Sequence, residues 1–264
     1  MRDRAAVAPV TSRDRIVISI CLVAITALAW AYLIRLDRQM SASMEYDMTM
    51  AAMGMTMQAP WSAADVWLTL VMWMVMMVGM MTASAAPVLL LFAAMAATRQ
   101  ERGVHISTLT FGLGYLVVWA GFSVCAALGQ WGLHEATLLS SAMRTSSPRL
   151  GGGMLVAAGA YQLTPVKTAC LAHCRSPLGF LMTNWRNGVA GAFQIGCRHG
   201  VHCVGCCWAL MTILFVVGVM NLAWVAVLAG FVLFEKLSPA GLTLSRVAGV
   251  MLVLFGLVLM LRPA

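Results

Sequence analysis

The chain has 264 residues, of which 61% are hydrophobic and 10% charged, and its mean hydropathy is +0.88. A soluble domain carries about 45–50% apolar and about 25% charged residues, so this composition excludes an ordinary soluble enzyme, a disordered tail and a coiled coil. The net charge of +8 is explained by basic loops on the cytoplasmic side of a membrane, and we expect no nucleic-acid partner.

Seven apolar segments suggest spans of a lipid bilayer, in which a spanning helix needs about 20 mostly apolar residues; the sixth is short and follows the fifth with only Asn221 between them. In chain order they are residues 16–36, 66–97, 104–128, 150–166, 201–220, 222–234 and 247–261. Lipid offers no hydrogen-bond partner to an open backbone, and none of the segments alternates as a barrel strand does. The sequence therefore predicts an all-α, polytopic transmembrane bundle of about seven spans.

The distribution of basic residues sets the expected orientation. Most of the 17 Lys and Arg residues lie on the cytoplasmic side if the N-terminus is cytoplasmic. An odd number of spans then places the C-terminus outside. We predict a cytoplasmic tail at residues 1–15, an uncleaved anchor helix at 16–36, a methionine-rich outer loop at 37–65, and a metal-binding membrane bundle at 66–264.

Methionine is concentrated in the predicted outer loop. The residues are Met40, Met44, Met48, Met50, Met53, Met55 and Met57. A thioether is a soft, uncharged ligand that binds metal without losing a proton, and it selects Cu(I) over harder ions. The loop is therefore a candidate for copper capture. An amphipathic interfacial segment that uses Met as adaptable apolar filler remains the alternative.

The second predicted span repeats this bias. Met72, Met76 and Met80 are four residues apart and share one helix face, with Met81 beside it. Such a ladder of sulfur atoms could pass Cu(I) inward by ligand exchange. Ordinary helix packing by long apolar side chains is the alternative for these residues.

Apart from Cys21 and Cys125, which we assign to packing, all cysteines fall within residues 170–207. Cys170 and Cys174 would share one face of a helix. At about 100° per residue, a second stripe contains His199, His202, Cys203 and Cys206, with Cys207 at its edge. Imidazole and thiolate ligands suit Cu(I) or zinc. We predict that the two groups bridge neighbouring helices at the cytoplasmic end of the bundle.

Two other functions remain open for the cysteines. Cys203 and Cys206 form a C-x-x-C pair, as in a thiol–disulfide oxidoreductase, which would make the chain an enzyme. A zinc site that staples two helices inside a membrane complex is the other. We favour non-catalytic metal handling, because a redox pair needs neither the histidines nor the methionine-rich side.

Glu235 and Lys236 are expected to form an interfacial ion pair, and Asn221 to cap a helix.

Several motifs resemble a bacterial family of uncharacterised integral membrane proteins described as predicted metal-binding. They are YQLTPVK at 161–167, CL at 170–171, CRSP at 174–177, Gly200, CVGCCWALM at 203–211, MN at 220–221 and EK at 235–236. The resemblance extends from about Trp67 to the C-terminus. It implies metal binding and a location in the bacterial inner membrane, and it implies no substrate.

The sulfur ligands lead to a functional hypothesis. We expect an integral membrane protein that captures, transfers or delivers Cu(I), with zinc as the second candidate metal. A metallochaperone or a cuproenzyme would be its partner, and the sequence leaves the oligomeric state open.

Overall fold

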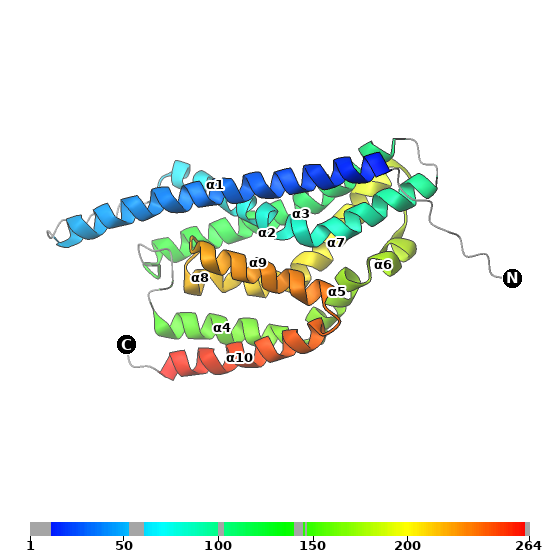
Figure 1. Ribbon diagram of the computed structural model, residues 1–264. Coiled ribbons are helices and arrows are strands. Elements are labelled where there is room, and N and C mark those ends of the chain that lie inside the picture. The colour runs from blue at the N-terminus through cyan, green and yellow to red at the C-terminus, as the bar shows by residue number, and fades with distance from the viewer. Residues whose placement is uncertain (1–11, 53–60, 100–102, 140–144, 146, 262–264) are drawn as a thin grey trace.

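The structure is a computed structural model that describes residues 12–52, 61–99, 103–139, 145 and 147–261. Its fold is all-α, as predicted (Figure 1). The helices are α1 (Ser12–Ala52), α2 (Ala63–Thr98), α3 (Val104–Glu135), α4 (Pro148–Gln162), α5 (Pro165–Arg175), α6 (Pro177–Asn184), α7 (Gly188–Thr212), α8 (Leu214–Val217), α9 (Leu222–Leu237) and α10 (Gly241–Leu261).

In the described part of the chain, five stretches are long and apolar enough to cross a membrane. They are Arg15–Ser41, Ala63–Thr98, Val104–Glu135, Gly188–Val217 and Gly241–Leu261. The predicted fourth and sixth spans correspond to α4 and α9, which have 15 and 16 residues. Both are shorter than the roughly 20 residues of a full crossing. The total of seven spans and the cytoplasmic N-terminus therefore remain predictions.

The first helix is longer than the predicted anchor. Its backbone continues past residue 36 to Ala52, through part of the segment expected to be the methionine-rich outer loop. The helix-breaking residues Gly54 and Pro60 come only after this point. Met53, Met55 and Met57 lie outside the described residues, as do the side chains of Met44, Met48 and Met50.

Helix α7 begins well before the predicted start at residue 201. Residues 188–200 contain polar side chains that lower the local hydropathy, yet the helix starts at Gly188 and packs closely against α3. A Cβ atom added at Gly196 would collide with the carbonyl oxygen of Phe111, so only glycine allows this approach. The cysteine and histidine stripe consequently lies in the middle of α7, and the expected position at the end of a span is wrong.

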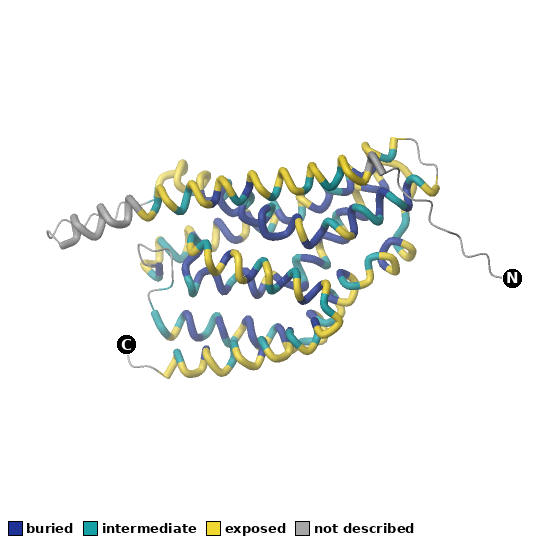
Figure 2. Tube along the Cα trace, viewed as in Figure 1, coloured by how far each residue is buried: buried dark blue, intermediate teal, exposed yellow. Residues whose placement is uncertain are grey.

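Burial follows the layers of the bundle (Figure 2). The inner faces of α2, α3 and α7 form a continuous apolar core, whereas α1 and α10 expose large apolar side chains on their outer faces. Cys21 and Cys125 are exposed, so their assignment to packing is wrong. A thiol is only weakly polar and costs little against lipid, which makes such positions tolerable in a membrane.

Candidate metal centre

Two helices bring cysteine thiols together in the interior. Thr164 caps the start of α5, where its Oγ accepts a hydrogen bond from the Lys167 backbone N–H at 3.2 Å. From there α5 packs against α7. The thiol of Cys174, near the end of α5, interacts with the thiols of Cys203 and Cys206 on α7. All three residues are buried, so thiols from helices distant in sequence meet away from water.

Cys203 is the centre of this cluster and contacts polar groups from two further helices, α9 and α3. Its Sγ lies 3.0 Å from Nζ of Lys236 on α9 and 3.2 Å from the hydroxyl oxygen of Tyr115 on α3. Lys236 also donates a hydrogen bond to Oγ of Ser84 on α2 at 3.0 Å. The lysine is buried, and a buried charge requires a partner in this apolar surrounding. A thiolate at Cys203 would supply one.

The predicted ion pair between Glu235 and Lys236 is wrong. Neighbouring residues on a helix point in different directions, and Glu235 instead pairs with Lys167 at 3.0 Å. Both side chains are only 1% exposed. This pair joins the start of α5 to the end of α9 and leaves Lys236 directed at Cys203.

The thiols do not form a finished ligand shell. Within the described ranges, no three His, Cys, Asp or Glu side chains are arranged to hold a metal ion together. The thiols of Cys206 and Cys207 donate hydrogen bonds to the Cys203 carbonyl oxygen, at 3.1 and 3.0 Å. A protonated thiol can donate in this way, whereas a thiolate cannot. Deprotonation would free both sulfur atoms to turn away from their own helix.

Cys170 lies at the edge of the cluster and is half-buried. Its sulfur packs against Gly205, where an added Cβ would come within 2.8 Å of Sγ. The hydroxyl of Tyr161 donates to the Gly205 carbonyl oxygen at 2.5 Å. Of the predicted cysteine ligands, Cys170 is therefore the one placed furthest from the interior.

The two predicted histidine ligands lie against aromatic rings. His199 is 2% exposed and packs among aromatic rings, with centroid distances of 5.4 Å to Phe180, 5.7 Å to Tyr115 and 6.2 Å to Phe111. Its Nδ1 has no hydrogen-bond partner among the described residues. His202 stacks on His173 instead. The regular helical stripe thus divides between two environments, since His199 is buried among aromatic rings and His202 is half-buried against His173.

The methionine stripe of α2 is buried, and the next residue along its face contacts the lysine of the cluster. Met72, Met76, Met80 and Met81 all lie in the apolar core. Four residues after Met80 on the same face comes Ser84, which accepts the hydrogen bond from Lys236. The ladder of thioethers therefore ends beside the ammonium group that contacts Cys203. Each methionine also makes ordinary packing contacts, so its role as a ligand stays a prediction.

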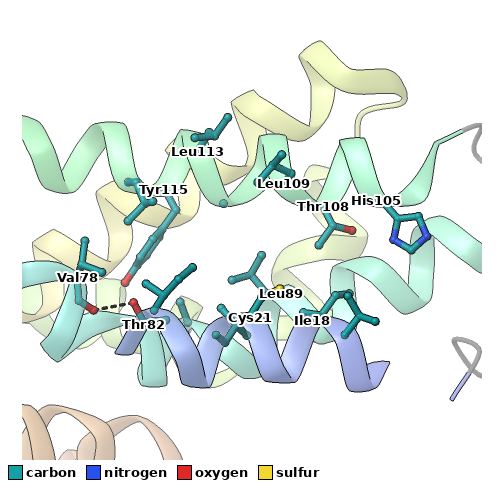
Figure 3. A pocket seen from close by; sticks show the side chains of 16 residues that line it. Ile18, Cys21, Val78, Thr82, Leu89, His105, Thr108, Leu109, Leu113 and Tyr115 are labelled. Atoms are coloured by element: carbon teal, nitrogen blue, oxygen red, sulfur yellow. Dashed lines mark hydrogen bonds between the residues drawn. The ribbon is translucent and has the colours of Figure 1, made fainter. Parts of the chain in front are cut away.

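A cavity of about 280 Å³ lies between α1, α2 and α3 (Figure 3). Its walls are almost entirely apolar, with Thr82 and Tyr115 among its few polar groups. Among the described residues that line the cavity, no three His, Cys, Asp or Glu side chains are grouped to hold a metal. The side chain of Tyr115 lies between this cavity and the thiol cluster, because it lines the cavity and its hydroxyl group contacts Cys203.

Sequence reasoning missed Ser84 and Tyr115 as members of the centre, and it assigned Lys236 to the wrong partner. A lysine placed at the end of a short apolar segment carries a usable signal, because ionisable groups in a membrane are costly and mark functional sites. Ser84 and Tyr115 carry no such signal, since polar hydroxyl groups are common in membrane helices.

The fold and the cluster define an all-α protein whose helices can span a membrane and which holds a buried centre of thiols and one lysine. Residues 70–259 match the PpoB2 family, described as copper chaperones. The chain belongs to this family, which confirms the relation to a metal-handling family. The match begins within α2, so α1 lies outside it. No curated protein and no solved structure matches the chain.

Proposed function

We propose that the protein is an integral membrane chaperone of the bacterial inner membrane that accepts Cu(I) and passes it on. Cys174, Cys203 and Cys206 hold the ion as transient cargo. The observation that carries this proposal is the meeting of Cys174 on α5 with Cys203 and Cys206 on α7 in the buried interior. Thiolates are soft ligands that select Cu(I), in keeping with the family description.

The lysine explains how a site without a finished ligand shell receives the ion. Before loading, the Lys236 ammonium occupies the side of Cys203 at which a cation is favoured. On loading, Cu(I) replaces this ammonium beside Cys203, and Lys236 keeps its hydrogen bond to Ser84. Cys206 releases its proton on loading, so the Cys203 and Cys206 thiolates together balance the charges of Cu(I) and of the Lys236 ammonium, which limits the electrostatic cost of placing copper in an apolar interior.

Methionines supply the route to the thiols. The methionine-rich segment that follows the anchor collects Cu(I) on the outer side, and Met72, Met76 and Met80 pass it along α2. Their buried positions and the adjacent Ser84 support this assignment. Thioethers suit such a path because they bind Cu(I) without a proton to release. The sequence has no P-loop motif, and the net movement in this proposal is passive or coupled to a metallochaperone or cuproenzyme partner.

Cu(I) binding to the purified full-length protein, measured anaerobically against a chromophoric Cu(I) chelator, tests this proposal. Changes outside the ligand shell already weaken metal sites by about 10–100-fold. We therefore expect Cys203→Ser and Cys206→Ser to weaken Cu(I) binding by at least as much. Cys125→Ser is the matched control, because Cys125 is exposed on α3, and it should bind as the wild type does.

X-ray absorption should report mainly sulfur ligands. Equal Cu(I) affinity in the wild type, Cys203→Ser and Cys206→Ser would end the proposal. Bound zinc whose removal unfolds the protein would favour the structural zinc staple. Rapid disulfide exchange at Cys203 with no copper bound would favour the oxidoreductase.

A further inference from the structure

The cavity between α1, α2 and α3 is elongated along the helices. Helices α1 and α3 each pack against α2, and the cavity lies between them. Its lining extends from Val17 to Ile25 on α1 and from His105 to Leu116 on α3. At a rise of about 1.5 Å per residue, these stretches correspond to about 12 and about 17 Å of helix. In a bundle that crosses a bilayer, the cavity therefore runs in the direction of the neighbouring lipid chains.

The cavity opens on the outer surface of the bundle. Several of its lining residues are exposed, among them Val17 and Ile25 on α1 and Leu109 and Leu113 on α3. A residue that both lines a cavity and is exposed lies at the mouth of that cavity. The mouth is therefore between α1 and α3, where the apolar surface of a membrane protein meets lipid.

The walls of the cavity favour an apolar occupant. Thr82 and Thr108 each donate a hydrogen bond to the carbonyl oxygen four residues earlier in the same helix, at 2.6 and 2.8 Å. The hydroxyl group of Tyr115 contacts Cys203. The hydroxyl groups in the lining are thus already engaged. A polar ligand would lose its hydrogen bonds to water on entering, whereas a hydrocarbon chain has none to lose.

One end of the cavity carries a positive charge. The α1 side of the lining includes a stripe of residues spaced three or four apart on one helix face: Ile18, Cys21, Leu22 and Ile25. Arg15, three residues before Ile18, extends this stripe and is exposed. Figure 3 shows Ile18 at the end of the cavity opposite Tyr115. The topology favoured by the basic residues places the Arg15 end at the cytoplasmic leaflet, which carries anionic lipid.

We propose that this cavity binds a phospholipid with an anionic headgroup. One acyl chain lies between α1 and α3, and the phosphate group pairs with the Arg15 guanidinium, which forms charge-assisted hydrogen bonds with phosphate. The chain packs against the ring of Tyr115, whose hydroxyl group contacts Cys203. This inference rests on the membrane location in the proposed function and is independent of copper. A failure of Cu(I) binding would therefore leave it intact.

Protection of Cys21 from alkylation tests the proposal in the full-length protein. Cys21 lines the cavity and is exposed. In delipidated protein in micelles, phosphatidylglycerol at about ten times its dissociation constant should slow maleimide alkylation of Cys21 by about tenfold, because the unoccupied fraction falls with lipid concentration. Cys125 is the internal control, since it is exposed on α3 outside the lining, and its rate should not change. Equal rates for Cys21 with and without the lipid would overturn the proposal.

The headgroup assignment has its own comparison. Phosphatidylcholine at the same concentration should protect Cys21 less than phosphatidylglycerol does, and Arg15→Gln should remove this difference. Arg246→Gln is the matched control, because Arg246 is exposed on α10, and it should keep the difference. Equal protection by the two lipids in the wild type would overturn the choice of an anionic headgroup.

Filling the cavity provides a second test. A Cβ atom at Gly112 would meet only Leu89, at 3.9 Å, so the cavity has room for a larger side chain there. Gly112→Leu also raises helix propensity. We expect this variant to lose most of the phospholipid that the wild type retains on purification, as measured by native mass spectrometry. Gly121→Leu is the control, because Gly121 is exposed on α3 with nothing within 4 Å. Equal phospholipid retention in the two variants would overturn the site.

Discussion

Two lysines are buried in the bundle, and their positive charges are balanced in different ways. Lys167 has a carboxylate partner, Glu235, at 3.0 Å. Among the described residues, the hydrogen-bond partners of Lys236 are Cys203 and Ser84, which are neutral or weakly acidic groups. The first lysine is part of a satisfied structural pair. The second is free to exchange its contact with Cys203 for another when a cation arrives.

This difference predicts unequal effects on stability. Glu235→Gln leaves the Lys167 ammonium uncompensated in the core and should destabilise the protein by about 3–5 kcal/mol, whereas replacing both partners by apolar residues is often neutral. We therefore expect Lys167→Met/Glu235→Leu to recover most of the loss. Denaturant unfolding in micelles measures both. If the double variant were as unstable as Glu235→Gln, charge compensation would not be the reason for the pair.

At the scale of elements, short helices create the centre. Helices α5 and α9 both end beside the middle of α7. Their last turns supply Cys174 and Lys236. Pro177 follows the end of α5, and Pro239 follows the end of α9. Because proline cannot continue a helix that precedes it, both breaks are set locally. Two continuous spans would carry their polar side chains past the thiols.

The contact between α4 and α10 gives a test at the same scale. A Cβ atom at Gly152 would lie 2.6 Å from the carbonyl oxygen of Gly256, whereas one at Gly153 has no neighbour within 4 Å. We expect Gly152→Ala to destabilise the bundle by about 1–3 kcal/mol through overpacking. Gly153→Ala should be neutral or favourable by up to about 1 kcal/mol. Equal unfolding midpoints for the two variants would contradict this packing.

At the scale of the whole molecule, the orientation of the chain can be tested without knowing whether α4 and α9 cross the bilayer. Both five and seven spans place the termini on opposite sides, and the start of α1 and the end of α10 lie at opposite ends of the bundle (Figure 1). The basic residues favour a cytoplasmic N-terminus. Reporter fusions should therefore be active in the cytoplasm at the N-terminus and outside at the C-terminus. Two fusions active on the same side would refute this topology.

Much of the architecture follows from the sequence because it depends on local or averaged properties. Composition determines an all-α protein with apolar spans, and helical periodicity determines that Met72, Met76 and Met80 share a face, which the structure finds buried. The predicted capping role of Asn221 is confirmed, since its side chain accepts from the Trp224 backbone N–H at 3.3 Å. These features need information only from residues a few positions apart.

The composition of the centre was decided by tertiary structure alone. Periodicity places His199 and Cys203 four residues apart on one face, yet His199 packs among aromatic rings while Cys203 meets Lys236. Which neighbour covers each part of a helix depends on contacts between segments far apart in the chain. Local spacing can show which residues face the same way, and packing alone determines what they face.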